Sequence, residues 1–250
     1  MSTLSVHEVL AGARALLLDV DDTIVDTRGA MVAAGAHAAA ALWPHRPGDH
    51  RSMAQRYYDD PERWFPRYAA GEVPFEHMRA GRLEEVATAF GVQVPDDGHH
   101  AYEEAYGPAF RAAQRLFPDV PELLSTAERR GLPIALLTNS AHAPTTVKLE
   151  ALGLVDRFDV VVTTDTLGFG KPDARVYLEA CRRVGADPGA VACLGDSLEW
   201  DVLGARAAGL RAIWLDRVGA GTDRAVASVR SLDEVTTALT SRFGCALGDR

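Results

Sequence analysis

The chain has 250 residues, of which 47% are hydrophobic and 24% are charged, values that are ordinary for a folded globular protein. Its formal net charge is −9 at pH 7, which excludes a general electrostatic attraction to nucleic acid polymers or anionic membranes. Any phosphate group that binds is therefore expected at a local site. The length allows one large domain, or a core domain with a smaller second one.

Cysteine usage and the N-terminal residues bear on the cellular compartment. The three cysteines form no C-x-x-C pair, so neither a zinc site nor a disulfide framework is expected. Glu8 and Arg14 interrupt the apolar stretch that a secretory leader would need. No uncharged apolar stretch is long enough to span a bilayer. These observations predict a cytoplasmic protein.

The most informative local pattern is the apolar run Leu16–Leu18 followed by Asp19, Asp21 and Asp22. Such a run is typical of a buried parallel strand that ends at a site. The clustered carboxylates repel one another, and a fold tolerates this where a cation, a bound proton or water offsets the repulsion. A plain turn could use Asp and Thr but does not need so many acids. We expect a hard-metal site here, because open α/β sheets bind ligands at the carboxyl ends of their strands.

Residues 27–116 read almost entirely as helix. The expected helices are Ala30–Trp43, Met53–Asp59, Glu62–Ala70, Pro74–Phe90 and Gly98–Leu116. Prolines and glycines separate them. All the strands that the sequence predicts lie elsewhere, so this segment is interpreted as a helical insert after the first strand of an α/β domain.

From Phe117 onwards, short apolar strands alternate with helices. Strands are expected at 133–137, 158–162, 190–194 and 210–215, and helices at 121–130, 144–152, 173–184, 200–208 and 231–242. This alternation predicts a parallel sheet with right-handed crossover connections. The expected fold class is therefore α/β with a central parallel sheet.

Two of the later strand ends carry polar or acidic residues that could belong to a site. Thr138 and Asn139 could hold a phosphate oxygen through a hydroxyl and a backbone N–H, although alone they are more typical of a turn or a helix cap. Asp196 directly follows a strand, as Asp19 does. Asp201 falls at a helix start, where an acid can also simply complement the helix dipole.

Lys171 lies on a glycine-containing loop before a helix. The loop is not a nucleotide P-loop, because Asp165 stands where the first glycine is needed and Pro172 stands where Ser or Thr is needed. It also fails as a dinucleotide fingerprint, since Asp173 replaces the third glycine. Taken alone, Lys171 would more often be a solvated loop lysine.

The order of these motifs along the chain is more specific than any one of them. Asp-Val-Asp-Asp-Thr at 19–23, Thr138, Lys171 in Gly-Lys-Pro-Asp, and Gly-Asp-(four residues)-Asp at 195–201 follow one another on successive strand ends. This set resembles the haloacid dehalogenase-like hydrolase superfamily, in the branch with a helical cap inserted after the first motif. The resemblance runs from Ala15 to about Arg217, and the cap matches only in position and helical character.

The resemblance implies a Rossmann-like three-layer core of residues 1–26 and 117–250, with a mobile helical cap domain of residues 27–116. It also implies Mg2+-dependent phosphoryl transfer through an aspartyl-phosphate. The implied roles are Asp19 as nucleophile and metal ligand, Asp21 as general acid/base with its backbone carbonyl on the metal, Thr138, the Asn139 amide and Lys171 as phosphate ligands, Asp196 as metal ligand, and Asp201 as support for the metal and Lys171. Mg2+ and Lys171 would offset the repulsion between an attacking carboxylate and a dianionic ester.

The expected activity is hydrolysis of a small-molecule phosphomonoester, by a monomer or homodimer without nucleic acid or membrane partners. A phosphomutase similar to β-phosphoglucomutase is the nearest alternative, since it would pass the phosphoryl group to a second sugar hydroxyl. The dehalogenases of the superfamily lack an acid two residues after the nucleophile, so Asp21 disfavours carbon–halogen cleavage. A non-catalytic binding module also stays open, because fold alone does not fix function.

Overall fold

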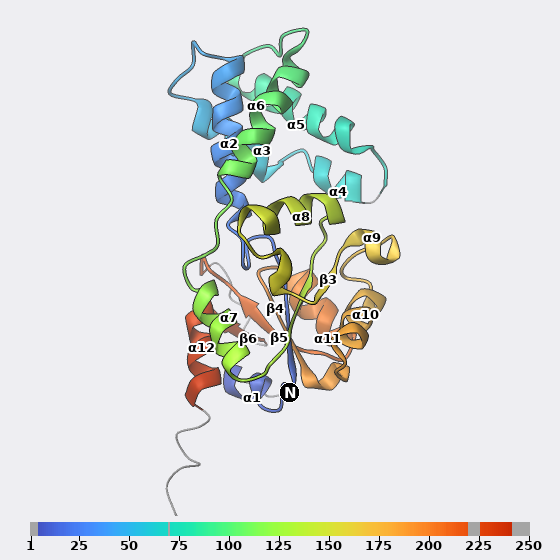
Figure 1. Cartoon of the computed structure of the whole chain (residues 1–250). Helices are drawn as coiled ribbons and strands as arrows, with labels where there is room; N and C mark the ends of the chain where they lie inside the picture. The colour runs from blue at the N-terminus through green and yellow to red at the C-terminus, as the bar shows by residue number, and fades with distance from the viewer. Residues whose placement is uncertain (1–4, 70, 220–225, 242–250) are drawn as a thin grey trace, which may run out of the picture. The chain divides into compact units, whose positions relative to one another are not determined.

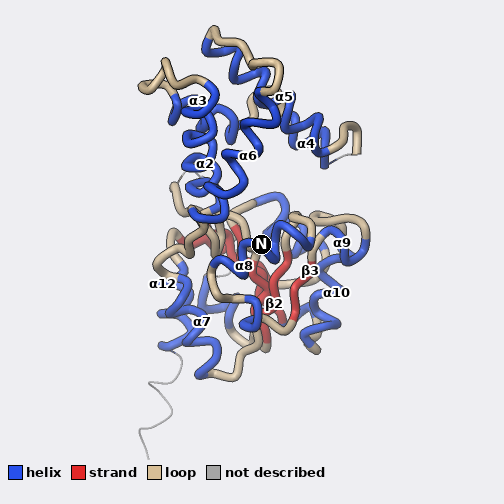
Figure 2. The backbone as a smooth tube through the Cα atoms, turned by 45° about the horizontal axis from the view of Figure 1, so that its top comes forward, coloured by secondary structure: helices blue, strands red, loops and turns tan. Residues whose placement is uncertain are grey.

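The computed structural model describes residues 5–69, 71–219 and 226–241. The chain divides into two compact units, one formed by Met1–Asp26 with Leu116–Arg250 and the other by Thr27–Arg115 (Figure 1). The strands belong to the first unit, and the second is helical (Figure 2). No helix within the described ranges is long and apolar enough to cross a membrane.

The first unit is built around a six-stranded sheet in the order β3-β2-β1-β4-β5-β6, and every neighbouring pair is parallel. The strands are β1 (Ala15–Leu18), β2 (Ile134–Leu137), β3 (Val160–Val162), β4 (Val191–Gly195), β5 (Arg211–Leu215) and β6 (Ala227–Val229). The predicted α/β fold with a central parallel sheet is confirmed. The strand order reverses between β1 and β4, and ligands of such sheets bind outside the strand ends at that point.

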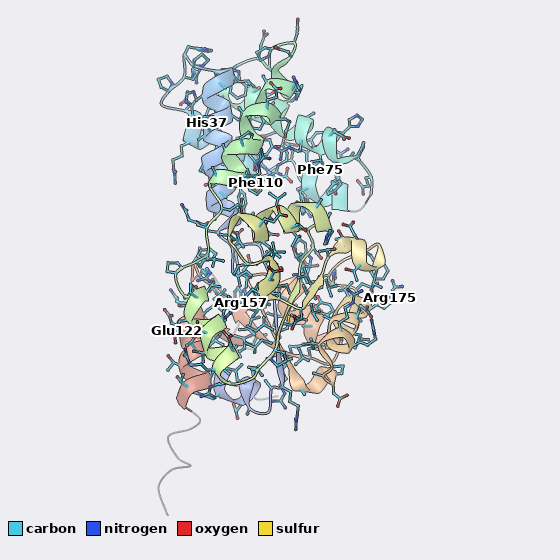
Figure 3. The ribbon with its side chains drawn as sticks, viewed as in Figure 1. His37, Phe75, Phe110, Glu122, Arg157 and Arg175 are labelled. Carbon is cyan, nitrogen blue, oxygen red and sulfur yellow. The ribbon has the colours of Figure 1, made fainter. Side chains whose placement is uncertain are left out.

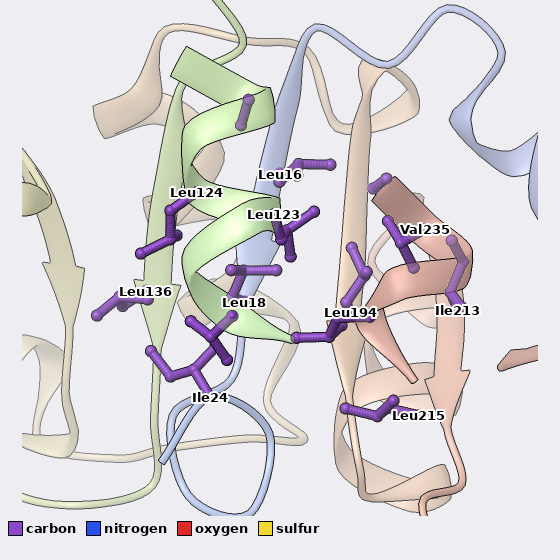
Figure 4. Packing of buried hydrophobic residues seen from close by; sticks show 14 of the residues in the cluster. Leu16, Leu18, Ile24, Leu123, Leu124, Leu136, Leu194, Ile213, Leu215 and Val235 are labelled. Atoms are coloured by element: carbon purple, nitrogen blue, oxygen red, sulfur yellow. The ribbon is translucent and has the colours of Figure 1, made fainter. Parts of the chain in front are cut away.

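Helices cover both faces of this sheet, which explains why its strands read as continuous apolar runs. Leu16 and Leu18 point to one face, where they pack with α1 (Val6–Leu10), α7 (Val120–Arg129) and α12 (Leu232–Thr240) (Figure 4). Ala15 and Leu17 point to the other face, toward α10 (Ala174–Val184). Fully burying each leucine side chain contributes about 1.5–3 kcal/mol.

The remaining helical segments of this unit lie in the connections between the strands. They are α8 (His142–Ala151), α9 (Thr164–Leu167), two 3-10 turns (Val155–Arg157 and Pro188–Ala190), a π-helix (Leu198–Gly204) and α11 (Ala205–Ala207). On the surface, α7 exposes Glu122 while Leu123 faces the core, and Arg175 at the start of α10 is solvent-exposed (Figure 3).

The sequence did not predict α1, β6 or α9, and it predicted an ordinary helix over 200–208. The structure instead has the π-helix there, followed by the short α11. The Ser197 side chain accepts a hydrogen bond from the Trp200 backbone N–H, and the Tyr177 hydroxyl donates to the Trp200 carbonyl. These contacts satisfy backbone groups at the wide turn. Such turns frequently occur at functional sites.

The second unit consists of α2 (Thr27–Leu42), α3 (His50–Asp59), α4 (Trp64–Ala69), α5 (Phe75–Phe90) and α6 (Gly98–Ala112). Small residues such as Ala34 and Ala38 on α2 pack in one core with Tyr57 of α3 and Tyr102 of α6. The two tyrosine rings lie 5.5 Å apart, centre to centre. Because alanine side chains are short, the aromatic residues fill the space between the helices.

Candidate active site

The strand register brings the polar motifs to one edge of the sheet. Leu18 pairs with Leu136 of β2 and with Leu194 of β4, so the segments after these strands emerge side by side. The Asp19 backbone N–H donates to the Leu194 carbonyl at 3.0 Å, which continues the ladder by one step. Asp19 is thereby fixed beside the loop that carries Asp196.

Lys171 joins two of the predicted acids. Its Nζ donates to Oδ1 of Asp19 and to Oδ1 of Asp201, each at 2.6 Å, and to the Leu137 carbonyl at 3.0 Å. All three charged side chains are buried, so Lys171 is not the solvated loop lysine that its local sequence alone would favour. The structure therefore places one ammonium group between two carboxylates from different strand ends.

Burial and charge act in opposite directions on this group. Burial raises the pKa of Asp19 well above its ordinary value, and the nearby carboxylates of Asp201, Asp196 and Asp21 raise it further, against the lowering effect of Lys171. Burial alone would lower the pKa of Lys171, but the charges of Asp19 and Asp201 and their hydrogen bonds raise it above its ordinary value. Lys171 is thus a permanent cation, and any further positive charge nearby would stabilise the ionised form of Asp19.

The loop that carries Lys171 is held by Asn139. The Asn139 side chain accepts from the Lys171 backbone N–H at 2.7 Å and donates to the Lys171 carbonyl at 3.0 Å. At the preceding position, Gly170, a Cβ atom would overlap the Asn139 side-chain oxygen, so only glycine lets the two loops approach this closely. The side chain of Asn139 therefore has a bracing contact, which the sequence did not predict.

Asp201 is positioned in a similar way from the π-helix. Its Oδ2 accepts from the Ser197 backbone N–H at 3.0 Å, while its Oδ1 accepts from Lys171. Gly195, the last residue of β4, lies so close to the Asp201 carboxyl group that a Cβ atom there would overlap it. The glycine of the Gly-Asp motif thus makes room for the acid that follows six residues later.

Three carboxylates form a group that suits a divalent cation. Asp19, Asp196 and Asp201 each offer one oxygen, and these oxygens lie within 4.8 Å of one another. Together with Lys171 they carry three negative charges and one positive charge when ionised, which leaves a formal excess of −2. Carboxylate oxygens are the ligands that Mg2+ and Ca2+ prefer. The donor set and its charge therefore fit a hard divalent ion, with Asp201 available as a ligand as well as a support.

Asp196 lies at the exposed rim of this group. Partial desolvation of its carboxylate, together with the nearby charges of Asp201 and Asp22, raises its pKa to about 7. Its backbone N–H donates to Oγ1 of Thr23 at 3.0 Å. The fully buried Thr23 therefore ties the acidic loop after β1 to the loop after β4.

Asp21 faces a different set of partners from Asp19. Its Oδ2 accepts from Oγ of Ser140 at 3.0 Å and from Oγ1 of Thr138 at 3.3 Å, and its Oδ1 accepts from Nζ of Lys148. The two acids of the Asp-Val-Asp motif are thus held by separate groups. Thr138 lies next to Asp21, while its predicted role in phosphate binding stays a prediction.

Sequence reasoning missed Ser140 and Lys148 as site residues. Thr145, Lys148 and Leu149 are all buried on α8 and follow the i, i+3, i+4 spacing of an inward-facing helix stripe. A lysine at an apolar-stripe position was the available signal, because lysines are almost never buried without a partner. Its partner, Asp21, lies 127 positions earlier in the chain.

Known proteins similar to this chain include several phosphatases. The phosphoserine phosphatase of Thermus thermophilus is 42% identical over 110 residues, which are 43% of this chain and 44% of that relative. The ribulose-1,5-bisphosphate 5-phosphatase of Halopiger xanaduensis is 31% identical over 209 residues, covering 82% of this chain and 85% of the relative. An (S)-2-haloacid dehalogenase from a Pseudomonas species is 35% identical over 103 residues, which are 41% of this chain and 44% of that enzyme.

Solved structures and family models agree with the fold. A HAD-hydrolase from Bacillus subtilis, described as bound to magnesium, superimposes with a TM-score of 0.71 at 22% identity, covering 91% of this chain and 99% of that one. Residues 13–209 match the family model described as haloacid dehalogenase-like hydrolase. That match spans strands β1 to β4, the helical unit and every acid of the site. The chain therefore belongs to the haloacid dehalogenase-like hydrolase family.

Proposed function

We propose that the protein is a Mg2+-dependent phosphatase that hydrolyses a small-molecule phosphomonoester through an aspartyl-phosphate. The observation that carries the proposal is the buried Asp19–Lys171–Asp201 group, with Asp196 beside it, at the point where the strand order reverses. Phosphatases among the similar proteins support the same reaction class. The net charge of −9 favours a small anionic substrate held locally over a polymer or a membrane.

In the proposed first step, a carboxylate oxygen of Asp19 attacks phosphorus, and the bond from phosphorus to the alcohol oxygen breaks. Asp21 gives a proton to the departing oxygen, so the alcohol leaves neutral. In the second step a water molecule attacks phosphorus, Asp21 takes its proton, and phosphate leaves as the Asp19 carboxylate forms again. Splitting the reaction in this way avoids one difficult direct displacement.

The other residues of the site would bind the transferring group. Lys171, which is already a cation between two acids, would stabilise negative charge on the phosphoryl oxygens. Thr138 and the Asn139 backbone N–H would hold further oxygens. Mg2+ bound by Asp19, Asp196 and the Asp21 backbone carbonyl, with Asp201 nearby, would supply the positive charge that lets a carboxylate approach a dianionic ester.

The helical unit is proposed to act as a cap that selects the substrate. It forms its own core and contributes none of the acids or lysines described above. We propose that the protein works as a monomer or homodimer on a small phosphate ester, with no nucleic acid or membrane partner.

The test is a phosphate-release screen over a panel of metabolite phosphate esters, run with Mg2+ and with excess EDTA. The expected result is release that needs the metal and disappears in Asp19→Asn. Release that persists in Asp19→Asn would overturn the proposed nucleophile. Transfer of the phosphoryl group only to a second sugar hydroxyl would identify a mutase instead, and metal-independent halide release from 2-haloacids would identify a dehalogenase.

A further inference from the structure

The chain contains 24 arginines but only two lysines, Lys148 and Lys171. Both lysines are buried, with 4% and 6% of their surface exposed. Lys171 contacts Asp19, and Lys148 contacts Asp21, so each acid of the Asp-Val-Asp motif has its own lysine. The proposed reaction uses Lys171 and leaves Lys148 without a role.

Donors from two different elements hold the Asp21 carboxylate on both of its oxygens. Lys148 on α8 donates to Oδ1, while Ser140 and Thr138 in the loop after β2 donate to Oδ2. Lys148 also lies 3.4 Å from Oγ of Ser140, so the three donors form one connected network. A carboxylate bound on both oxygens has little freedom to rotate about its terminal bond.

Stability alone gives a weak reason for this network. Burying an ammonium group costs several kcal/mol, and buried ion pairs often contribute no more stability than apolar residues of similar volume. Lys148 occupies a buried position of α8 beside Leu149, which packs in the sheet core. The contact between the Lys148 ammonium group and Asp21 therefore indicates a role other than stability.

We propose that Lys148 is a positioning residue, which orients the Asp21 carboxylate for proton transfer to the leaving group and from water. This inference rests on the proposed phosphatase function. Proton transfer by a side chain depends on placement within hydrogen-bond reach of the reacting group. Lys148 contacts Asp21 directly, so it acts through this acid and needs no contact with the substrate.

The test compares two substrates whose leaving groups differ in their need for a proton. The 4-nitrophenolate ion leaves readily as an anion, whereas the phenolate of phenyl phosphate gains more from protonation. General acid catalysis contributes about 10²–10⁴-fold, so Asp21→Asn should lower kcat/KM far more for phenyl phosphate than for 4-nitrophenyl phosphate. Lys148→Met should show the same selectivity, with at least about a tenfold larger loss for phenyl phosphate, because it loosens the same acid.

A double-mutant cycle distinguishes positioning from a general structural effect. Adding Lys148→Met to Asp21→Asn should change kcat/KM for phenyl phosphate less than about threefold, since residues that act as a unit are non-additive. Leu149→Val, which loosens packing at the next residue of α8, should leave the substrate ratio unchanged. If Lys148→Met does not fold, Lys148→Gln replaces it in the same cycle.

The inference is overturned if Lys148→Met slows both substrates equally, leaves the ratio at its wild-type value, or multiplies with Asp21→Asn. The proposed function fails in a different way. In that case the unmodified protein would release no phosphate from either substrate with Mg2+. A wild-type protein that is active, beside a Lys148 variant with an unchanged ratio, would reject only the role of Lys148.

Discussion

Both units of the molecule bury cations, and they satisfy them differently. At the strand ends, Lys171 lies between the carboxylates of Asp19 and Asp201. In the helical unit, Arg82 is 5% exposed and donates to the backbone carbonyls of Tyr57 and Tyr58. Lys171 therefore contacts two charged carboxylates, whereas Arg82 mainly donates to backbone carbonyls, which carry no net charge.

This difference separates the candidate active site from a structural one. Around Arg82 the nearest carboxylate, of Asp60, lies 3.7 Å away, and the guanidinium stacks over the Tyr57 ring at 4.5 Å. That environment leaves no excess charge. At the strand ends, Lys171 contacts two of three clustered carboxylates, and the remaining negative charge favours a further cation. Buried charge therefore indicates chemistry here only where it is left unbalanced.

The largest expected effect comes from Lys171. Lys171→Met removes the charge that would stabilise the transferring phosphoryl group, so kcat/KM should fall by about 10²–10³-fold, or roughly 3 kcal/mol or more. The variant should also unfold at a lower temperature without Mg2+, since Asp19 and Asp201 lose their shared cation. Phosphate-release kinetics and thermal unfolding check both effects. Arg175→Met, at an exposed position of α10, is the control that should change neither.

Arg82 tests the other side of the comparison. Arg82→Met leaves the Tyr57 and Tyr58 carbonyls without their donor in a buried place, so the free energy of unfolding should fall by about 2–4 kcal/mol. Urea unfolding followed by circular dichroism measures this loss. Arg51→Met, on the exposed face of α3, should stay within about 0.5 kcal/mol of the wild type. Equal stability of the Arg82 and Arg51 variants would show that Arg82 is not structural.

Asp196 provides a test of charge imbalance. Asp196→Asn removes one of three mutually repelling carboxylates, so the melting temperature without metal should rise slightly, while the stabilisation by added Mg2+ should shrink. The rise is expected to be small because Asp196 is exposed at the rim. Thermal shift measurements over a range of Mg2+ concentrations give both quantities. A variant with an unchanged Mg2+ response would remove Asp196 from the ligand set.

The pH dependence of stability tests a structural acid whose charge is balanced. Burial would raise the pKa of Asp119, but hydrogen bonds from Arg217, the Leu232 backbone N–H and Ser231 outweigh it and lower that pKa. A lowered native pKa adds stability that is complete above the unfolded value of about 4 and is lost as the pH falls through the native value. Asp119→Asn should therefore cost about 1–2 kcal/mol at pH 7, and this difference should shrink below about pH 4.

Urea unfolding at pH 7, 5, 4 and 3 measures that dependence. Glu128→Gln, which removes an exposed carboxylate from α7, should show a difference below about 1 kcal/mol at every pH. A difference between wild type and Asp119→Asn that stays constant down to pH 3 would contradict the assigned pKa direction.

The sequence predicted the parallel sheet and placed Asp19, Lys171 and Asp201 on successive strand ends. Both predictions were possible because apolar runs and the residues that follow them are local signals. It missed β6, since Ala227–Val229 offers only three residues and one of them, Ser228, is exposed. It also predicted an ordinary helix where Asp201 sits in a wider π-helix. Hydrogen bonds from groups distant in sequence, such as the Tyr177 hydroxyl, accompany that turn.

The sequence also did not predict side-chain contacts between residues that lie far apart in the chain. Lys148 lies on a predicted helix, but nothing near it in sequence reveals that it contacts Asp21. The sequence assigned a role only to the Asn139 backbone N–H, and the structure adds that the Asn139 side chain braces the Lys171 backbone, 32 positions away. Sequence patterns thus located the clustered acids and Lys171, and the fold was needed to find what orients them.

The central claim is that Asp19 attacks phosphorus in a site whose excess negative charge is offset by a divalent cation. Mass spectrometry of peptides from acid-quenched turnover mixtures tests it most directly. With substrate and Mg2+, we predict one added phosphoryl group on the peptide that contains Asp19, and none when EDTA is present or when Asp19 is replaced by Asn. Sustained phosphate release with the phosphoryl group found on a different residue would contradict the account.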